Sequence, residues 1–135
     1  MSYPLDTNAC IAIINGSPQG VRRRLRSTLT QGEPVAVSSI ALFELWYGVA
    51  KSARTGANTE RLAVSLAPLE TLLFDDDDAH AAGAVRAALE QAGAPIGAYD
   101  TLLAGQAIHR GLVLVTANVA EFARVTGLAW QNWGE

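Results

Sequence analysis

Short apolar runs alternate with longer amphipathic runs along the whole chain. The apolar runs have the length of strands and cover 3–5, 34–39, 71–74, 112–116 and 128–131. Runs with helical spacing lie between them, at 9–15, 18–32, 39–52, 59–68, 75–93, 101–111 and 117–125. Strands that alternate with helices form parallel βα units, and a parallel sheet needs helices on both faces. The sequence therefore predicts an α/β fold, a three-layer α/β/α sandwich around a central, mainly parallel sheet of four to five strands.

Length and composition favour one domain over residues 1–135, because 135 residues with 50% hydrophobic side chains suffice for a single core. No run of about eighteen apolar residues exists, and Asp6 follows the start at once, which predicts a cytoplasmic chain without a membrane span. Cys10 is the only cysteine, so no internal disulfide forms. The formal charge of −3 argues against bulk electrostatic coating of nucleic acid.

Glu44 lies in the middle of SSIALFELWYGVAKS, residues 38–52, which is apolar on nearly all sides. Such a helix is usually enclosed, and we expect Ser39 to cap it. No basic residue lies one turn before or after Glu44, and an unpaired buried carboxylate costs several kcal/mol. Either Glu44 faces a wet cleft, or a positive charge from outside the chain lies beside it.

Other polar side chains follow the ends of predicted strands. Asp6 follows the first strand, Thr116 and Asn118 follow the fourth, and Asp100 begins the helix that leads into the fourth. Ligands of open parallel sheets bind at the carboxyl ends of the strands, where Glu44 can also project. Converging carboxylates without a cation suit Mg²⁺ or Mn²⁺, whose usual chemistry with phosphates is hydrolysis.

Structural roles compete with this interpretation. Asp6 could simply cap the following helix, and Asp100 could simply favour a first helical turn. Asp75 to Asp78, although acidic, are expected to cap a helix rather than to bind a metal. Glu44 is the hardest to explain structurally.

Four segments together resemble the PIN-domain family, in particular its VapC-type toxin ribonucleases. They are LDTN (5–8), SSIALFELWYGVAKS (38–52), PIGAYDTLLAGQAI (95–108) and LVLVTANVAEFARVTGLAWQNW (112–133). The resemblance implies an α/β/α fold and an Mg²⁺- or Mn²⁺-dependent endoribonuclease that leaves 5′-phosphate and 3′-hydroxyl ends. It also implies a homodimer, inhibited by a cognate antitoxin whose tail enters the active-site groove.

By position, the resemblance assigns the three acidic metal ligands to Asp6, Glu44 and Asp100. The fourth catalytic position, often Asp in the family, is Asn118 here, which brings no charge. Glu121, one turn on, could substitute for the missing acid.

Two neutral residues are expected to support the site. Thr116 matches a hydroxyl commonly found beside the fourth position, and Asn8 is near enough in sequence to orient Asp6. Pro4 departs from the family's aliphatic first strand, and it predicts irregular pairing if that strand is central.

Basic and aromatic residues are candidate contacts with partners. The candidate RNA contacts are Arg22, Arg23, Arg24, Lys51 and Arg54. A solvated helix face remains the alternative for the arginine run. Trp46 with Tyr47 is the candidate dimer contact.

A catalytically inactive PIN-fold protein that binds RNA or a partner protein is the alternative function, and Asn118 is the argument for it. The presence of Asp6, Glu44 and Asp100 favours the enzyme, because an inactive site has no evident need for a costly acid among apolar residues.

Overall fold

The computed structural model describes residues 2–135. Its elements, in chain order, are β1 (Tyr3–Leu5), α1 (Thr7–Asn15), α2 (Gln19–Thr30), β2 (Val35–Ser38), α3 (Ser39–Ala50), α4 (Thr55–Leu66), β3 (Glu70–Leu72), α5 (Asp76–Gln91), α6 (Ala98–Arg110), β4 (Val113–Val115), α7 (Val119–Phe122) and β5 (Ala129–Gln131). None of the helices within these residues has both the length and the apolar character needed to cross a bilayer.

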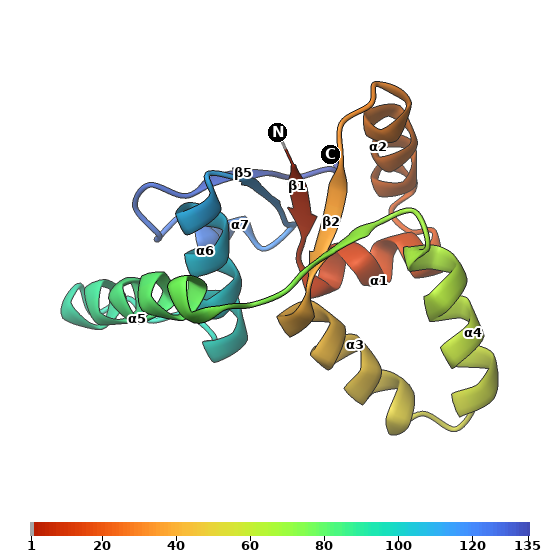
Figure 1. Ribbon diagram of the computed structural model, residues 1–135, viewed down its shortest axis with the longest axis horizontal. Coiled ribbons are helices and arrows are strands. Elements are labelled where there is room, and N and C mark those ends of the chain that lie inside the picture. The colour runs from red at the N-terminus through yellow and green to blue at the C-terminus, as the bar shows by residue number, and fades with distance from the viewer. Residues whose placement is uncertain (1) are drawn as a thin grey trace.

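The five strands form one sheet in the order β3-β2-β1-β4-β5, and every pair is parallel (Figure 1). Strand β1 is therefore central, as expected for a chain that begins with a buried strand. In Figure 1, α3 and α4 form one limb below the sheet and α5 with α6 forms another. The prediction of an α/β/α sandwich with a mainly parallel sheet is confirmed.

Two apolar cores lie on the two sides of the sheet. The larger core unites residues mostly of β1, β2 and α1 to α4, including Leu5, Cys10, Val35, Val37, Ala41 and Leu45. The smaller core unites residues mostly of α5, α6, β4 and α7, including Leu89, Ala104, Leu114 and Phe122. Helices α1, α2, α3 and α6 pack against the strands, whereas α4 packs on α1 and α3 and α5 packs on α6, which accounts for both cores.

Pro4 affects the pairing of β1 on one side only. Toward β2 the register is regular, from Tyr3↔Val35 to Leu5↔Val37. Toward β4 the only paired position is Leu5↔Val115. Alternate backbone N–H groups point to opposite neighbours, and the N–H of Asp6 donates to Val115 O at 3.0 Å. The position that lacks an N–H therefore faces β4, and the expected irregularity is found there.

Several predicted helix starts differ from the structure: α1 begins at Thr7 and α6 at Ala98, two and three residues before the predicted positions, and the starts of α3 and α4 are wrong as well. The N-cap of α3 is Ser38, whose Oγ accepts from the Ile40 N–H at 3.2 Å, whereas Ser39 is the first helical residue. Helix α4 begins at Thr55, four residues before the predicted Thr59. No side chain caps α4 at Arg54, so the sequence lacked the usual start signal. Asp75, by contrast, caps α5 within a capping box, as predicted.

Helix α3 is not enclosed, contrary to the expectation from its composition. Only Ala41 and Leu45 are buried, whereas Phe43, Trp46 and Tyr47 are 55%, 45% and 59% exposed. The apolar residues therefore form two faces, one in the core and one on the surface. Surface aromatic residues in such a row are typical of a protein contact rather than of a core.

Candidate active site

Asp6 lies where β1 ends and α1 begins, and it is 3% exposed. Its Oδ1 accepts a hydrogen bond from the Ala9 N–H at 2.8 Å, so Asp6 also caps α1. Burial raises the pKa of Asp6, the hydroxyl of Thr116 and the Ala9 N–H lower it, and the charge of Glu44 raises it. The net pKa is higher than usual, because these hydrogen bonds do not offset burial.

Glu44 projects from α3 beside the start of α1. Its Oε1 accepts a hydrogen bond from the hydroxyl of Thr7 at 2.6 Å. No Lys or Arg in residues 2–135 forms an ion pair with Asp6, Glu44 or Asp100. Glu44 is only partly buried, and its hydrogen-bond donor is neutral. The structure therefore accommodates this acid in an apolar helix by placing it at a half-open site.

Thr7 is a site residue that the sequence interpretation missed. It lies inside the LDTN motif, between Asp6 and the predicted support Asn8. Asn8 is exposed and makes no hydrogen bond to Asp6 within the described chain; the Ala9 backbone orients Asp6 instead. Asn8 borders a separate cavity of about 240 Å³ with Pro18 and Trp133.

Asp100 lies in the first turn of α6, and its pKa is raised to about 7. Burial is the largest cause, followed by the hydrogen bond and charge of Glu121, and then by the charges of Asp6 and Glu44. The charges of three other carboxyl groups, those of Glu121, Asp6 and Glu44, therefore act on Asp100.

Asn118 and Glu121 form a second part of the site, around the short helix α7. The side-chain amide of Asn118 donates to Glu121 Oε2, and its backbone N–H donates to Thr116 Oγ1 at 2.9 Å. The Gly97 N–H donates to Glu121 Oε1 at 3.4 Å. The bond from Asn118 is the largest cause that lowers the pKa of Glu121. Asn118 thus holds an ionised Glu121 beside Asp100.

The donor set fits a hard divalent cation, although the acidic residues do not form a closed cage. No group of three or more His, Cys, Asp or Glu side chains in residues 2–135 converges as a metal-binding cluster. Mg²⁺ usually keeps several waters and takes one or two protein carboxylates, so an open arrangement suits it. Oxygen-only donors that repel one another and lack a cation point to the same class of ion.

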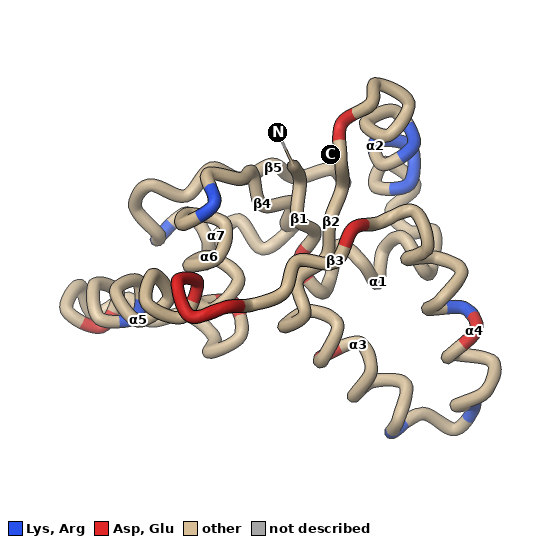
Figure 2. Tube along the Cα trace, in the orientation of Figure 1, with Lys and Arg blue, Asp and Glu red and all other residues tan. Residues whose placement is uncertain are grey.

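The candidate RNA contacts lie away from these carboxylates, along α2 and at the junction of α3 and α4 (Figure 2). Arg22 donates from Nε to Ile13 O at 2.7 Å and from Nη2 to Ile14 O at 3.0 Å, which completes the end of α1. Arg24 bonds Gln131 at 3.3 Å. The structure thus gives Arg22 a structural role.

The remaining three basic candidates are exposed. The Nζ atom of Lys51 lies 4.7 Å from the centroid of the Tyr47 ring, so the Lys51 charge contacts an aromatic side chain on the surface of α3. Arg23 and Arg54 form no ion pair within residues 2–135. Those two side chains are free to meet a polyanion.

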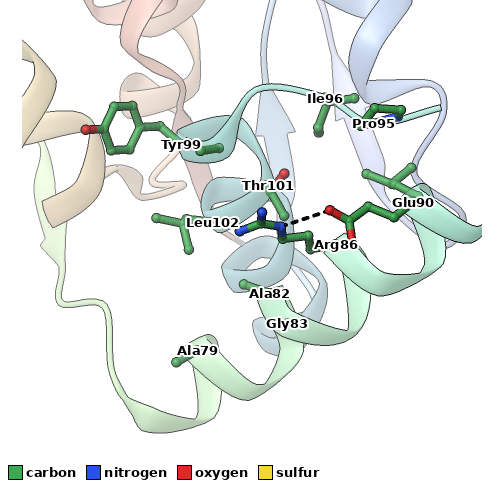
Figure 3. Close-up of a pocket in the computed structure, with 12 residues that line it drawn as sticks. Ala79, Ala82, Gly83, Arg86, Glu90, Pro95, Ile96, Tyr99, Thr101 and Leu102 are labelled. Carbon is green, nitrogen blue, oxygen red and sulfur yellow. Dashed lines mark hydrogen bonds and ion pairs between the residues drawn. The ribbon is translucent and has the colours of Figure 1, made fainter. Parts of the chain in front are cut away.

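A cavity of about 460 Å³ lies between α5 and α6 rather than among the carboxylates (Figure 3). Its charged lining residues are Arg86 and Glu90, which pair with each other at 3.3 Å. Tyr99 stands at its edge, next in sequence to Asp100. Because Arg86 and Glu90 pair with each other, the lining of this cavity offers no unpaired charged side chain for catalysis.

Known proteins resemble the chain over nearly its whole length. The family model of the PIN domain matches residues 3–128. The tRNA(fMet)-specific endonuclease VapC of Salmonella typhimurium is 38% identical over 133 residues, which cover 98% of each chain. Ribonuclease VapC2 of Rickettsia felis is 40% identical with the same coverage.

Solved structures agree with these relatives. VapBC2 from Rickettsia felis, bound to a DNA fragment from its promoter, matches with a TM-score of 0.93 at 38% identity, over 98% of this chain and 99% of that one. DNA-bound VapBC from Salmonella typhimurium matches with a TM-score of 0.91 at 38% identity, over 98% of both chains. The chain therefore belongs to the PIN-domain family, and within it to the VapC group.

Proposed function

We propose that this chain is a metal-dependent endoribonuclease that hydrolyses RNA phosphodiester bonds as the toxin of a toxin–antitoxin pair. The observation that carries the proposal is the shared rim of Asp6, Glu44 and Asp100. The charge of Glu44 raises the pKa of Asp6, and the charges of both raise the pKa of Asp100, without a cation from the described chain beside them. Full-length relatives named as ribonucleases support the choice of RNA as substrate.

Asp6, Glu44 and Asp100 would hold Mg²⁺ or Mn²⁺. When bound, the ion supplies positive charge that stabilises the transferring phosphate and makes water a stronger nucleophile. Neutral donors orient two of these carboxylates: the Ala9 N–H donates to Asp6, and the Thr7 hydroxyl donates to Glu44. Neutral donors fix the geometry of the carboxylates and leave their negative charge available for a cation.

Asn118 and Glu121 would complete the catalytic group. Asn118 carries no charge itself, but it holds the Glu121 carboxylate in place, and Glu121 accepts a hydrogen bond from Asp100 in its protonated form. Glu121 therefore brings to this edge the charge that an acid at position 118 would bring. This arrangement favours the enzyme over the inactive binding protein.

An antitoxin partner follows from the same family relationship. Two of the similar structures are of VapBC, from Rickettsia felis and Salmonella typhimurium, and this chain resembles their VapC component. A groove of about 280 Å³ runs beside Glu44, with Ile11, Leu45 and Leu62 among its lining residues. We expect an antitoxin segment that places apolar side chains in this groove and a basic side chain near Glu44.

Self-association, RNA contact and location complete the proposal. The exposed aromatic face of α3, with Trp46 and Tyr47, is suited to a homodimer contact. Arg23 and Arg54 are suited to RNA phosphates. A ribonuclease toxin meets its substrate in the cytoplasm, where we expect this chain to act.

The test is cleavage of total cellular RNA by the purified, antitoxin-free protein in Mg²⁺ or Mn²⁺, with the new ends mapped by sequencing. EDTA and Glu44→Gln should abolish discrete cuts that leave 5′-phosphate ends. Glu60→Gln, which removes an exposed acid on α4, is the matched control and should cut like wild type. Equal patterns from wild type and Glu44→Gln would show that the site is not catalytic and would favour the inactive binding protein.

A further inference from the structure

The connection between β3 and α5 joins the two helices that carry Glu44 and Asp100. In Figure 1 it runs in light green from the edge strand across the sheet to α5. On its way, the Phe74 N–H donates to Ser39 Oγ at 3.0 Å. Ser39 is the first residue of α3, five residues before Glu44. This bond ties the connection to the start of the Glu44 helix.

The preceding residue of the connection is tied to α6. Leu73 O accepts from Arg110 Nη2 at 2.7 Å and from Gln106 Nε2 at 3.4 Å. Both donors lie on the helix that carries Asp100. Consecutive backbone groups at 73 and 74 therefore bond to two different helices.

Asp78 anchors the same donors and is fully buried. It accepts from Gln106 Nε2 at 3.1 Å, from Arg110 Nε at 3.1 Å and from Arg110 Nη2 at 2.8 Å. Gln106 is only 2% exposed. A buried amide and a buried carboxylate are costly unless fully bonded, so this network holds one arrangement of α5, α6 and the connection.

The link matters because the carboxylates of the two helices repel each other. Both helices contribute to the larger core, α3 through Ala41 and Leu45 and α6 through Leu103, and α6 also contributes to the smaller core. Near the rim the helices also touch through Phe43 and Tyr99, whose rings lie 5.6 Å apart at the surface. Apolar contacts alone constrain this spacing weakly, because the hydrophobic effect is non-directional.

We propose that Ser39, Gln106 and Arg110 are positioning residues, which fix the spacing between Glu44 on α3 and Asp100 on α6 through the backbone of residues 73 and 74. The proposal rests on the proposed function, because that spacing matters for a divalent cation shared by the two carboxylates. Loss of Ser39 removes the bond between α3 and the connection. Loss of Gln106 or of Arg110 removes one of the two bonds between α6 and Leu73 O and disrupts the network around Asp78, so each change widens the range of separations.

The experiment measures Mn²⁺ binding to RNA-free protein by calorimetry in wild type, Ser39→Ala, Gln106→Leu, Arg110→Gln and Arg110→Lys. Arg86→Gln, which removes a surface ion pair on α5, is the matched control. The same set carries spin labels at Ala50→Cys and Ala98→Cys, diluted with unlabelled chain, to measure the distance between α3 and α6. Cys10 is fully buried, so labels attach only at the two new positions.

We expect Ser39→Ala, Gln106→Leu and Arg110→Gln to weaken Mn²⁺ affinity by about fivefold and to broaden the distance distribution. Arg110→Lys should fall between Arg110→Gln and wild type, because lysine keeps the charge and one donor. Arg86→Gln should match wild type in both measurements.

Variants that melt at lower temperature yet bind Mn²⁺ like wild type when folded would overturn the proposal, since their residues would then serve stability alone. An unchanged distance distribution would overturn it as well. Wild type that binds no more Mn²⁺ than Asp6→Asn would instead overturn the proposed function. In that case the spin-label distances still decide whether the network sets the separation of α3 and α6.

Discussion

The Thr7 hydroxyl and the Ala9 N–H orient Glu44 and Asp6 without neutralising their charges. Thr7 donates to Glu44 at 2.6 Å, and the Ala9 N–H donates to Asp6 at 2.8 Å. A lysine or arginine in either place would satisfy the carboxylate and compete with a cation. At the scale of single residues, neutral donors therefore orient Glu44 and Asp6 and leave neither of them paired with a cation of the described chain.

Removal of the Thr7 hydroxyl should weaken catalysis. Thr7→Val keeps the shape of the side chain and removes the donor to Glu44, so we expect kcat/KM for RNA cleavage to fall about tenfold. Thr7→Ser keeps the hydroxyl and should stay close to wild type. Equal activity of the valine and threonine proteins, measured at saturating Mn²⁺, would show that Glu44 needs no orientation by position 7.

The sequence predicted the acids of the site better than their neutral partners. Asp6, Glu44 and Asp100 could be singled out because charges beside apolar runs need an explanation. Thr7 carries no such signal, since a threonine beside a helix start is common. The hydrogen bonds of Arg22 could not be predicted for a related reason: the open carbonyls at Ile13 and Ile14 that it satisfies exist only once α1 ends there.

At the scale of elements, α5 and α6 cross at very short range. A Cβ built on Gly105 would lie 2.4 Å from the Cα of Ala82, closer than any real Cβ contact. Only glycine allows this crossing, because the opposing atoms belong to the backbone and cannot turn aside. The close approach also brings Gln106 within reach of Asp78.

Gly105→Ala should therefore destabilise the protein, by about 3 kcal/mol, because the two helices must separate. Gly83→Ala on α5 is the control, since a Cβ there would meet no atom within 4 Å, and a helical alanine should add about 0.5–1 kcal/mol of stability. Urea unfolding of both variants measures the difference. A loss in Gly105→Ala no larger than the change in Gly83→Ala would contradict the close crossing.

The Asp78 network predicts a loss of stability in acid. Burial acts to raise the pKa of Asp78, but hydrogen bonds from Arg110, from the Asp75 backbone and from Gln106 outweigh it and lower the pKa to about 2. An ordinary Asp titrates near pH 4, so the folded protein favours the ionised form, and this contribution is lost as pH falls from about 4 through about 2.

Asp78→Asn should lower the free energy of unfolding by about 2 kcal/mol at neutral pH. The gap from wild type should shrink below pH 4 and largely close near pH 2. Asp77→Asn, an exposed acid of the same helix, should keep a near wild-type profile in the same urea titrations. A gap that stays constant from pH 6 to pH 2 would mean that the charge of Asp78 is not what stabilises the network.

Helix order and type followed from the sequence, whereas the exposure of α3 did not. Apolar periodicity identifies a helix, but it does not distinguish a face that packs in the core from an exposed face that is available to bind another molecule. Phe43, Trp46 and Tyr47 illustrate this limit of sequence patterns, because they are residue types usual in a core and yet lie on the surface. The boundary of α4 was missed because Arg54 offers no capping side chain.

At the scale of the whole molecule, the exposed aromatic face should drive self-association. Trp46→Glu places a charge in the centre of that face, and we expect dimers to dissociate to monomers in size-exclusion chromatography with light scattering. Trp130→Glu, at a partly exposed tryptophan of edge strand β5, is the control and should leave the mass unchanged. A dimer that survives Trp46→Glu would place the contact on another surface.

Cys10 lies in the centre of the larger core, and burial raises the pKa of its thiol far above the usual range. A thiol that neither ionises nor reaches solvent reacts slowly with peroxide, disulfides and electrophiles. The catalytic rim itself contains only carboxyl, hydroxyl and amide groups. Oxidation of cysteine, which alters many enzymes, is therefore not expected to change this site.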